Sequence, residues 1–185
     1  MTENHLKLIY LISRYGKCAT TPEEEETWIR EVPLQVLVFE GIVNEVFDFD
    51  YAPISVQVSV AGGQRRLWMN ISQEGKAATD DLREWLLLNG LKTTTVDSLP
   101  ITALQLSARG ADLMKLIAPG IIEPVVGYLY PPGAPQKFAY LLQADFDPDE
   151  EKFVLSTSPR PQIAFGALGR PKHPEASQMP TAGSW

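Results

Sequence analysis

The sequence has little of the chemistry on which most catalytic and metal sites depend. It contains one cysteine, Cys18, and two histidines, His5 and His173, among 185 residues. A lone cysteine forms no intramolecular disulfide, which agrees with a reducing compartment, and we interpret Cys18 as a small buried hydrophobe. Because catalytic triads and tetrahedral zinc sites need more of these residues, we expect no catalytic residue, no metal site and no enzymatic activity.

Two segments resemble ligand-binding loops but lack residues that such loops require. Residues 145–149 read Asp-Phe-Asp-Pro-Asp, like the start of a calcium loop, but Glu150 stands where a glycine is needed and Ser156 where a bidentate glutamate is needed. The pair Gly62-Gly63 is not followed by Lys-Ser/Thr and lies inside a predicted hairpin, so it is no phosphate-binding loop. We expect no cofactor.

Long hydrophobic runs are also missing. Nothing approaches the roughly 18 apolar residues that cross a bilayer. Lys7, Arg14 and Lys17 interrupt or flank the apolar patch at residues 6–12, which argues against a signal peptide. We therefore expect an intracellular protein, cytoplasmic or nuclear, with no membrane partner.

Positive charge is scarce. The net charge is −7, and residues 1–62 carry four basic against ten acidic side chains. Proteins that bind duplexes gain much of their affinity from basic contacts to phosphate. Nucleic acid is therefore disfavoured as a partner, although the charge alone does not exclude it.

Three helices are predicted in the N-terminal region. Apolar residues at spacings of three and four predict a helix over residues 5–15, ending at Gly16. The run Thr21-Pro22-Glu23-Glu24 has the pattern of a capping box and predicts a second helix, which Pro33 ends or kinks. Residues 34–46 fit either a helix or a strand, and we favour the helix.

Two similar hairpin-helix units follow. Alternation predicts hairpins at residues 54–71 and 91–106. Ser72 caps a helix over residues 73–88 that Asn89-Gly90 closes, and Ser107 caps another that runs to about residue 117. Each serine is followed three residues later by a glycine, and the two motifs are 35 residues apart, so residues 54–89 and 91–118 are either a duplication or a repeated physical solution.

The C-terminal third has a different pattern. Strand-like runs at residues 121–130, 137–146 and 152–156 predict an antiparallel β meander over residues 119–157. Pro, Gly, Ser and Ala dominate residues 158–185, which predicts an irregular tail. The expected fold class is thus α+β, with an α+β region at residues 1–118 followed by the meander and the tail.

Residues 82–91 (LREWLLLNGL) and 100–113 (PITALQLSARGADL) resemble the recognition helix, wing and following helix of winged-helix proteins of the bacterial MarR and HxlR type. The resemblance implies a winged-helix-like region in which Arg83 on the helix and Lys92 on the wing touch phosphate. This helix departs from the family because Asp80, Asp81 and Glu84 surround Arg83. Winged helices also serve as protein-binding modules, and an acidic version suits that use better.

The leading hypothesis is a non-enzymatic protein-interaction or scaffold module within a larger assembly. Interfaces depend on aromatic and arginine anchors, and we nominate Trp68, Trp85 and Arg83. Core packing is the alternative for both tryptophans, and the one that we favour.

The rival hypothesis is a winged-helix regulator that binds nucleic acid. Its contacts would be Arg65, Arg66, Arg83, Lys92 and Arg109. A subunit or fragment whose chemistry lies elsewhere is a third reading.

Overall fold

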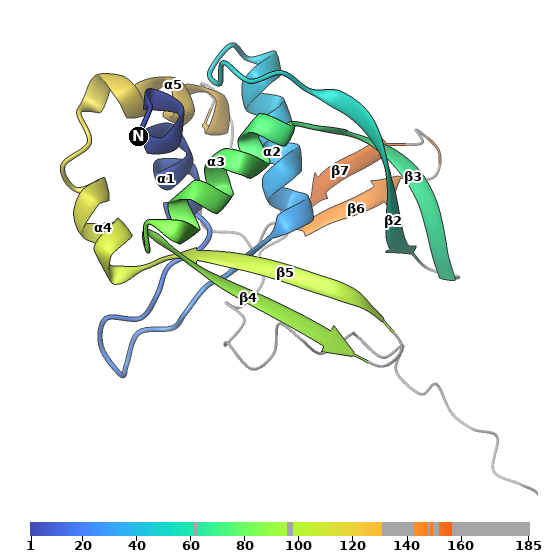
Figure 1. Cartoon of the computed structure of the whole chain (residues 1–185), viewed down its shortest axis with the longest axis horizontal. Helices are drawn as coiled ribbons and strands as arrows, with labels where there is room; N and C mark the ends of the chain where they lie inside the picture. Colours follow the sequence, from blue (N-terminus) through green and yellow to red (C-terminus); the bar gives the residue numbers. More distant parts are fainter. Residues whose placement is uncertain (61–62, 96–97, 131–142, 148, 150–151, 157–185) are drawn as a thin grey trace, which may run out of the picture.

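A computed structural model describes residues 1–60, 63–95, 98–130, 143–147, 149 and 152–156. Figure 1 shows a group of helices from which two long hairpins extend. The helices are α1 (Glu3–Ser13), α2 (Glu31–Val43), α3 (Gln73–Glu84), α4 (Ala108–Met114) and α5 (Pro119–Leu129). The strands are β1 (Ile29–Arg30), β2 (Ala52–Val60), β3 (Gly63–Ile71), β4 (Leu88–Thr95), β5 (Ser98–Leu106), β6 (Gln143–Asp147) and β7 (Lys152–Ser156).

The core forms around α1, as its apolar spacing predicts. Leu8, Ile9, Leu11 and Ile12 are completely buried, and α1 packs against α3, α4 and α5. Burying one such side chain stabilises the fold by about 1.5–3 kcal/mol. The helix predicted over residues 5–15 is therefore confirmed, with its ends at Glu3 and Ser13.

All strand pairs between the named strands are antiparallel. A three-stranded sheet has the order β1-β5-β4, and β2 with β3 and β6 with β7 form two-stranded sheets. The register pairs Val60 with Gly63 in one predicted hairpin and Thr95 with Ser98 in the other. Both hairpins and the α+β fold class are confirmed.

The helix predicted from Thr21 does not form. The backbone N–H and the hydroxyl of Thr20 both donate to Glu24 Oε2 at 2.8 Å, and these two bonds lower the pKa of the Glu24 carboxyl. The glutamate of the supposed capping box thus closes a local turn, and Trp28 and Ile29 are buried beyond it. Tertiary burial of an extended segment here overrides the capping pattern.

The helix favoured for residues 34–46 exists and starts earlier. Helix α2 begins at Glu31, so Pro33 is its third residue and not a stop. Proline is tolerated in a first turn because the N–H it lacks has no partner inside the helix.

Helix α3 ends four residues before its predicted end. Trp85 follows Glu84, and Leu86 reverses the chain with φ 61°, an unusual angle for leucine. Asn89 and Gly90 lie in β4, opposite Gln105 and Leu104, so their predicted role as a helix terminus was wrong. Pairing with β5 at the edge of the sheet therefore outweighs the local preference of these two residues for a helix C-terminus.

The two predicted serine caps have the same geometry. Ser72 Oγ accepts the N–H of Gly75 at 2.9 Å, and Ser107 Oγ accepts that of Gly110 at 3.0 Å. Each cap joins the second strand of a hairpin to a helix. Both a duplication and a repeated physical solution predict this shared geometry, so both stay predictions.

Residues 121–130 do not form the first strand of a meander. They belong largely to α5, which starts with Pro119 as its first residue and packs on α1. Val125 and Leu129, four residues apart, are completely buried. The β-branched content suggested a strand, but the spacing of four brings these side chains onto one helical face. Burial of that face favours the helix over the strand.

The strand predicted over residues 152–156 is confirmed as β7, whereas the strand predicted over residues 137–146 is described only from Gln143 onward. Strand β6 begins at Gln143 and pairs with β7, from Gln143 opposite Ser156 to Asp147 opposite Lys152. Residues 131–142 and the predicted tail at residues 158–185 lie outside the described part of the chain. Among the helices of the described part, none is long and apolar enough to cross a membrane.

Candidate functional site

A shallow groove lies between α2, α3 and β5. Its volume is about 210 Å³, and its lining residues are Glu31, Leu34, Gln35, Lys76, Thr79, Asp80, Arg83, Thr102 and Leu104. Leu34, Gln35, Thr79 and Leu104 are buried and form the base, while the charged side chains are partly exposed and form the rim. The groove therefore has an apolar and amide base beneath a charged rim.

The charges of the rim are arranged as two ion pairs. Lys76 Nζ lies 3.0 Å from Glu31 Oε1 and links α3 to α2. Arg83 Nη1 lies 3.1 Å from Asp80 Oδ1, one helical turn away. Because all four side chains are at least one third exposed, each pair adds little to stability, typically 0–1 kcal/mol.

Arg83 also packs on the sheet. A Cβ atom built at Gly90 would lie 2.9 Å from Arg83 Nε, so the guanidinium rests above the bare backbone of β4. Lys92 is two residues further along β4 and pairs with Thr102, a residue of the groove. Since residues two apart on a strand share a face, Lys92 stands on the same face as the groove. The structure thus brings Arg83 and Lys92 to one surface.

Gln35 is the unusual residue at the base of the groove. Its side chain is 4% exposed, and within the described part of the chain its Oε1 has no hydrogen-bond partner. A buried acceptor without a donor costs about 1–3 kcal/mol. The Oε1 atom is itself buried, so it lies beneath the surface of the groove and is not part of that surface.

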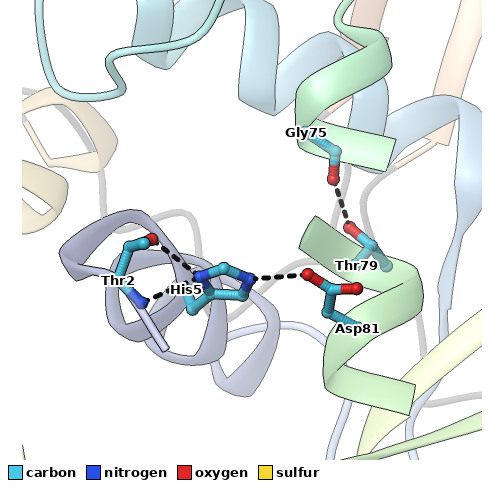
Figure 2. Close-up of polar contacts among 5 residues, drawn as sticks. All are labelled: Thr2, His5, Gly75, Thr79 and Asp81. Atoms are coloured by element: carbon cyan, nitrogen blue, oxygen red, sulfur yellow. Dashed lines mark hydrogen bonds and ion pairs between the residues drawn. The ribbon is translucent and has the colours of Figure 1, made fainter. Parts of the chain in front are cut away.

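The opposite side of α3 is tied to α1 by a histidine (Figure 2). The Thr2 N–H donates to His5 Nδ1 at 3.0 Å, which leaves Nε2 as the protonated nitrogen, 3.3 Å from Asp81 Oδ2. The His5 ring also lies against Trp85, with 5.0 Å between ring centroids. His5 is therefore explained as a structural link.

Trp68 projects from the outer face of β3 and is 72% exposed. The residue opposite it on β2 is Ser55, which is too small to cover an indole, and Arg66 lies two residues away on the same face. Trp85 is 37% exposed, and the neighbouring Leu86 is 67% exposed. The core positions that we favoured for Trp68 and Trp85 were therefore wrong, most clearly for Trp68.

The other basic residues nominated for nucleic acid do not form one cluster. Arg65 and Arg66 are exposed on β3 and point to opposite faces of the hairpin, as successive strand residues do. Arg109 is exposed in the first turn of α4. Across residues with described side chains, no group of three or more His, Cys, Asp or Glu could hold a metal ion.

One comparison with known proteins gives a match. The model of the Uncharacterized protein MJ1567 family matches residues 4–163 of this chain. The chain belongs to this family. No curated protein and no solved structure matches the chain. The matched residues include those of the groove and of the β2–β3 hairpin.

Sequence reasoning nominated Arg83, which lines the groove, and Lys92, which pairs with the groove residue Thr102, but it missed the groove itself. Gln35 lies among apolar residues in a segment that fitted a helix or a strand, and a polar residue on a buried helical face was the available signal. Glu31 in α2 and Lys76 in α3 are 45 residues apart in the sequence, and no local pattern indicates that they form an ion pair.

Proposed function

We propose that this chain is a non-enzymatic protein-interaction module of a larger intracellular assembly, and that it contacts a partner through the outer face of the β2–β3 hairpin. The observation that carries this proposal is the exposure of Trp68 on a regular strand. Tryptophan and arginine are the residue types that most often dominate binding energy at interfaces.

The continuous pairing of the two strands of the hairpin supports a contact surface that is formed before the partner binds. Nine residue pairs, from Ala52–Ile71 to Val60–Gly63, fix the register of β2 and β3. Buried Met69 and Ile71 alternate with exposed Trp68 and Asn70, so the inner face anchors the ribbon while the outer face remains open. A surface that is ordered before binding loses less conformational entropy when the partner arrives.

The charge of the hairpin indicates the kind of partner. Residues 52–71 include Arg65 and Arg66 and no aspartate or glutamate, although the whole chain carries a net charge of −7. A partner segment with an apolar side chain for the indole and a carboxylate for Arg66 would match this face. The proposed partner is therefore an acidic, partly apolar protein surface.

The proposal is tested with three baits in native extract treated with nuclease. Wild type, Trp68→Ala and Leu116→Ala are compared, because Leu116 is an 81% exposed hydrophobe that lies just beyond the C-terminal end of α4. We expect a defined protein set with wild type and Leu116→Ala that is lost with Trp68→Ala. Equal recovery with all three baits would contradict the proposed contact face.

A second candidate function is a winged-helix regulator that binds nucleic acid. The element order α1-β1-α2-α3-β4-β5, interrupted by the β2–β3 hairpin, and the strand order β1-β5-β4 favour it. Against it, exposed Glu74, Asp80 and Glu84 outnumber Arg83 on the outer face of α3. The test is duplex binding across salt concentrations, since phosphate contacts weaken steeply as salt rises. No binding at low salt would exclude this function.

A further inference from the structure

We propose that the edge of β3 is a second interaction surface and that its partner is β3 of a second copy of this chain. The two strands run antiparallel about a two-fold axis at Leu67 and join the two β2–β3 hairpins into one four-stranded sheet. This inference concerns the edge of the hairpin and does not rest on the proposed contact through its outer face.

The outer edge of β3 is open within the described part of the chain. There β3 pairs only with β2, and no residue from Gln64 to Asn70 forms a backbone hydrogen bond outside this pairing. Alternate residues of an edge strand direct their N–H and C=O groups away from the neighbouring strand. Nine residues at roughly 3.3 Å each extend this row of donors and acceptors over about 30 Å. Figure 1 shows β3 at the outer margin of the described structure.

Strand β3 has few of the features by which proteins block an open edge. Its register with β2 runs from Ile71 to Gly63 without a shift, so the strand has no bulge. It contains no proline, whereas β2 contains Pro53. A two-stranded hairpin alone is only marginally stable in water, and further strands stabilise it. The hairpin therefore gains stability from a strand added beside β3.

Two adjacent arginines restrict which strand fits this edge. Like charges directly opposite each other are destabilising, and antiparallel self-pairing centred on Arg65 or Arg66 places arginine opposite arginine. A two-fold axis at Leu67 instead places Arg66 opposite Trp68 of the second copy. The same axis places Arg65 opposite Met69. The charge of the edge thus selects one register for self-pairing.

The register about Leu67 also uses the whole strand. Leu67 is four residues from each end of β3 (Gly63–Ile71), so all nine residues have a partner. Opposite residues are an even number of positions apart, so their side chains lie on the same face and their backbone groups match. On the outer face, the exposed Trp68 and Arg66 form two cross-strand pairs of an indole with a guanidinium, one on each side of the axis.

The bodies of the two copies lie apart in this arrangement. Ile71 leads through Ser72 into α3, whereas Gly63 lies at the free end of the hairpin. Antiparallel pairing sets Ile71 of one copy opposite Gly63 of the other, so the helices occupy opposite ends of the joined sheet. The two outer faces lie on the same side of that sheet, which therefore presents both copies of Trp68.

Sedimentation equilibrium of the full chain over a range of micromolar concentrations tests the proposal. We expect wild type to form a dimer with twice the mass of one chain. Trp68→Lys places a cation opposite Arg66 in both halves of the interface and should weaken the dimer at least about tenfold. Leu116→Ala changes an exposed hydrophobe outside the hairpin and should associate as wild type does.

A double variant tests the register. Arg66→Glu combined with Trp68→Lys places a carboxylate opposite an ammonium in both halves, and should restore association to within about threefold of wild type. Because both side chains are exposed, we expect the circular dichroism spectrum of each variant to match that of wild type. A rescued dimer is therefore separable from an effect on folding.

Three results would overturn the proposal. The first is a wild-type chain that remains a monomer throughout the micromolar range. The second is a dimer that Trp68→Lys leaves intact, because its interface then lies elsewhere. The third is a dimer that Trp68→Lys disrupts and the double variant does not restore. None of these measurements uses native extract, so their outcome is independent of the bait experiment.

Discussion

The guanidinium of Arg83 rests on the backbone of Gly90, with Arg83 Nε 2.9 Å from the point that a Cβ of residue 90 would occupy. This contact joins the last turn of α3 to the edge strand β4 and orients Arg83 toward Asp80. The absence of a side chain at position 90 therefore shapes one wall of the groove.

Gly90→Ala should change the groove more than the stability. The new methyl group meets the end of a flexible side chain, which can move, and replacing glycine also lowers the entropy of the unfolded chain. We expect the free energy of unfolding in urea to stay within about 0.5 kcal/mol of wild type. The NMR signal of Arg83 Nε–H should shift, and an unmoved signal would show that the contact does not exist in solution.

Gly110→Ala is the contrasting case. A Cβ at position 110 would collide with the backbone oxygen of Leu87 and lie 2.8 Å from Leu106 Cδ1, where nothing can move cheaply. We expect a loss of at least about 2 kcal/mol in the free energy of unfolding, as for overpacked core positions. A loss no larger than that of Gly90→Ala would contradict the close approach of α4 to the turn before β4.

Removing the two serine caps should have unequal effects. Ser72→Ala removes one capping bond, which typically costs about 1 kcal/mol. Ser107→Ala removes the equivalent bond and also the bond that Ser107 Oγ donates to Leu86 O at 2.8 Å. We expect urea unfolding to show a larger loss for Ser107→Ala, by about 0.5–1.5 kcal/mol. Equal losses would mean that the bond to Leu86 contributes nothing.

Stability should fall at alkaline pH because of two buried phenols. Burial, followed by the neighbouring Tyr130, raises the pKa of Tyr15 above its usual range, and burial raises that of Tyr128. The unfolded chain releases these protons near pH 10, whereas the folded chain retains them. The stabilisation is therefore complete below about pH 10 and is lost as the pH rises further.

Urea unfolding between neutral pH and pH 11 measures this dependence. Tyr128→Phe removes one titrating group, at the cost of the bond from its hydroxyl to Leu37 O at 3.3 Å, and should make the loss of stability above about pH 10 less steep. An alkaline slope unchanged by this variant would contradict the burial of the Tyr128 hydroxyl.

The four tryptophans offer a test of exposure. Trp28 is 5% exposed and Trp68 is 72% exposed. Trp68→Ala should change the free energy of unfolding by less than about 0.5 kcal/mol, whereas Trp28→Ala should cost about 3 kcal/mol or more. Quenching of the indole fluorescence by iodide should fall in Trp68→Phe and persist in Trp28→Phe. The reverse pattern would place Trp68 in the core, where the sequence alone had favoured it.

The sequence by itself determined the elements whose signals are local. The alternation in residues 54–71 and 91–106 predicted both hairpins, Ser72 and Ser107 predicted two helix starts, and the apolar spacing after His5 predicted α1. These elements depend on interactions between residues one to four positions apart, and such interactions can be recognised from the sequence alone.

Tertiary structure decided the remainder, because long-range burial can outweigh local preference. The segment after Thr21 stays extended and buries Trp28 and Ile29, although its sequence has a capping pattern. The β-branched run after Gly120 forms a helix that buries Val125 and Leu129. Gly90 pairs with β5 as part of β4 and does not end a helix. The same long-range packing brought Glu31 to Lys76 and left Trp68 uncovered. Which side chains meet, and which remain open to a partner, depended on contacts between residues tens of positions apart.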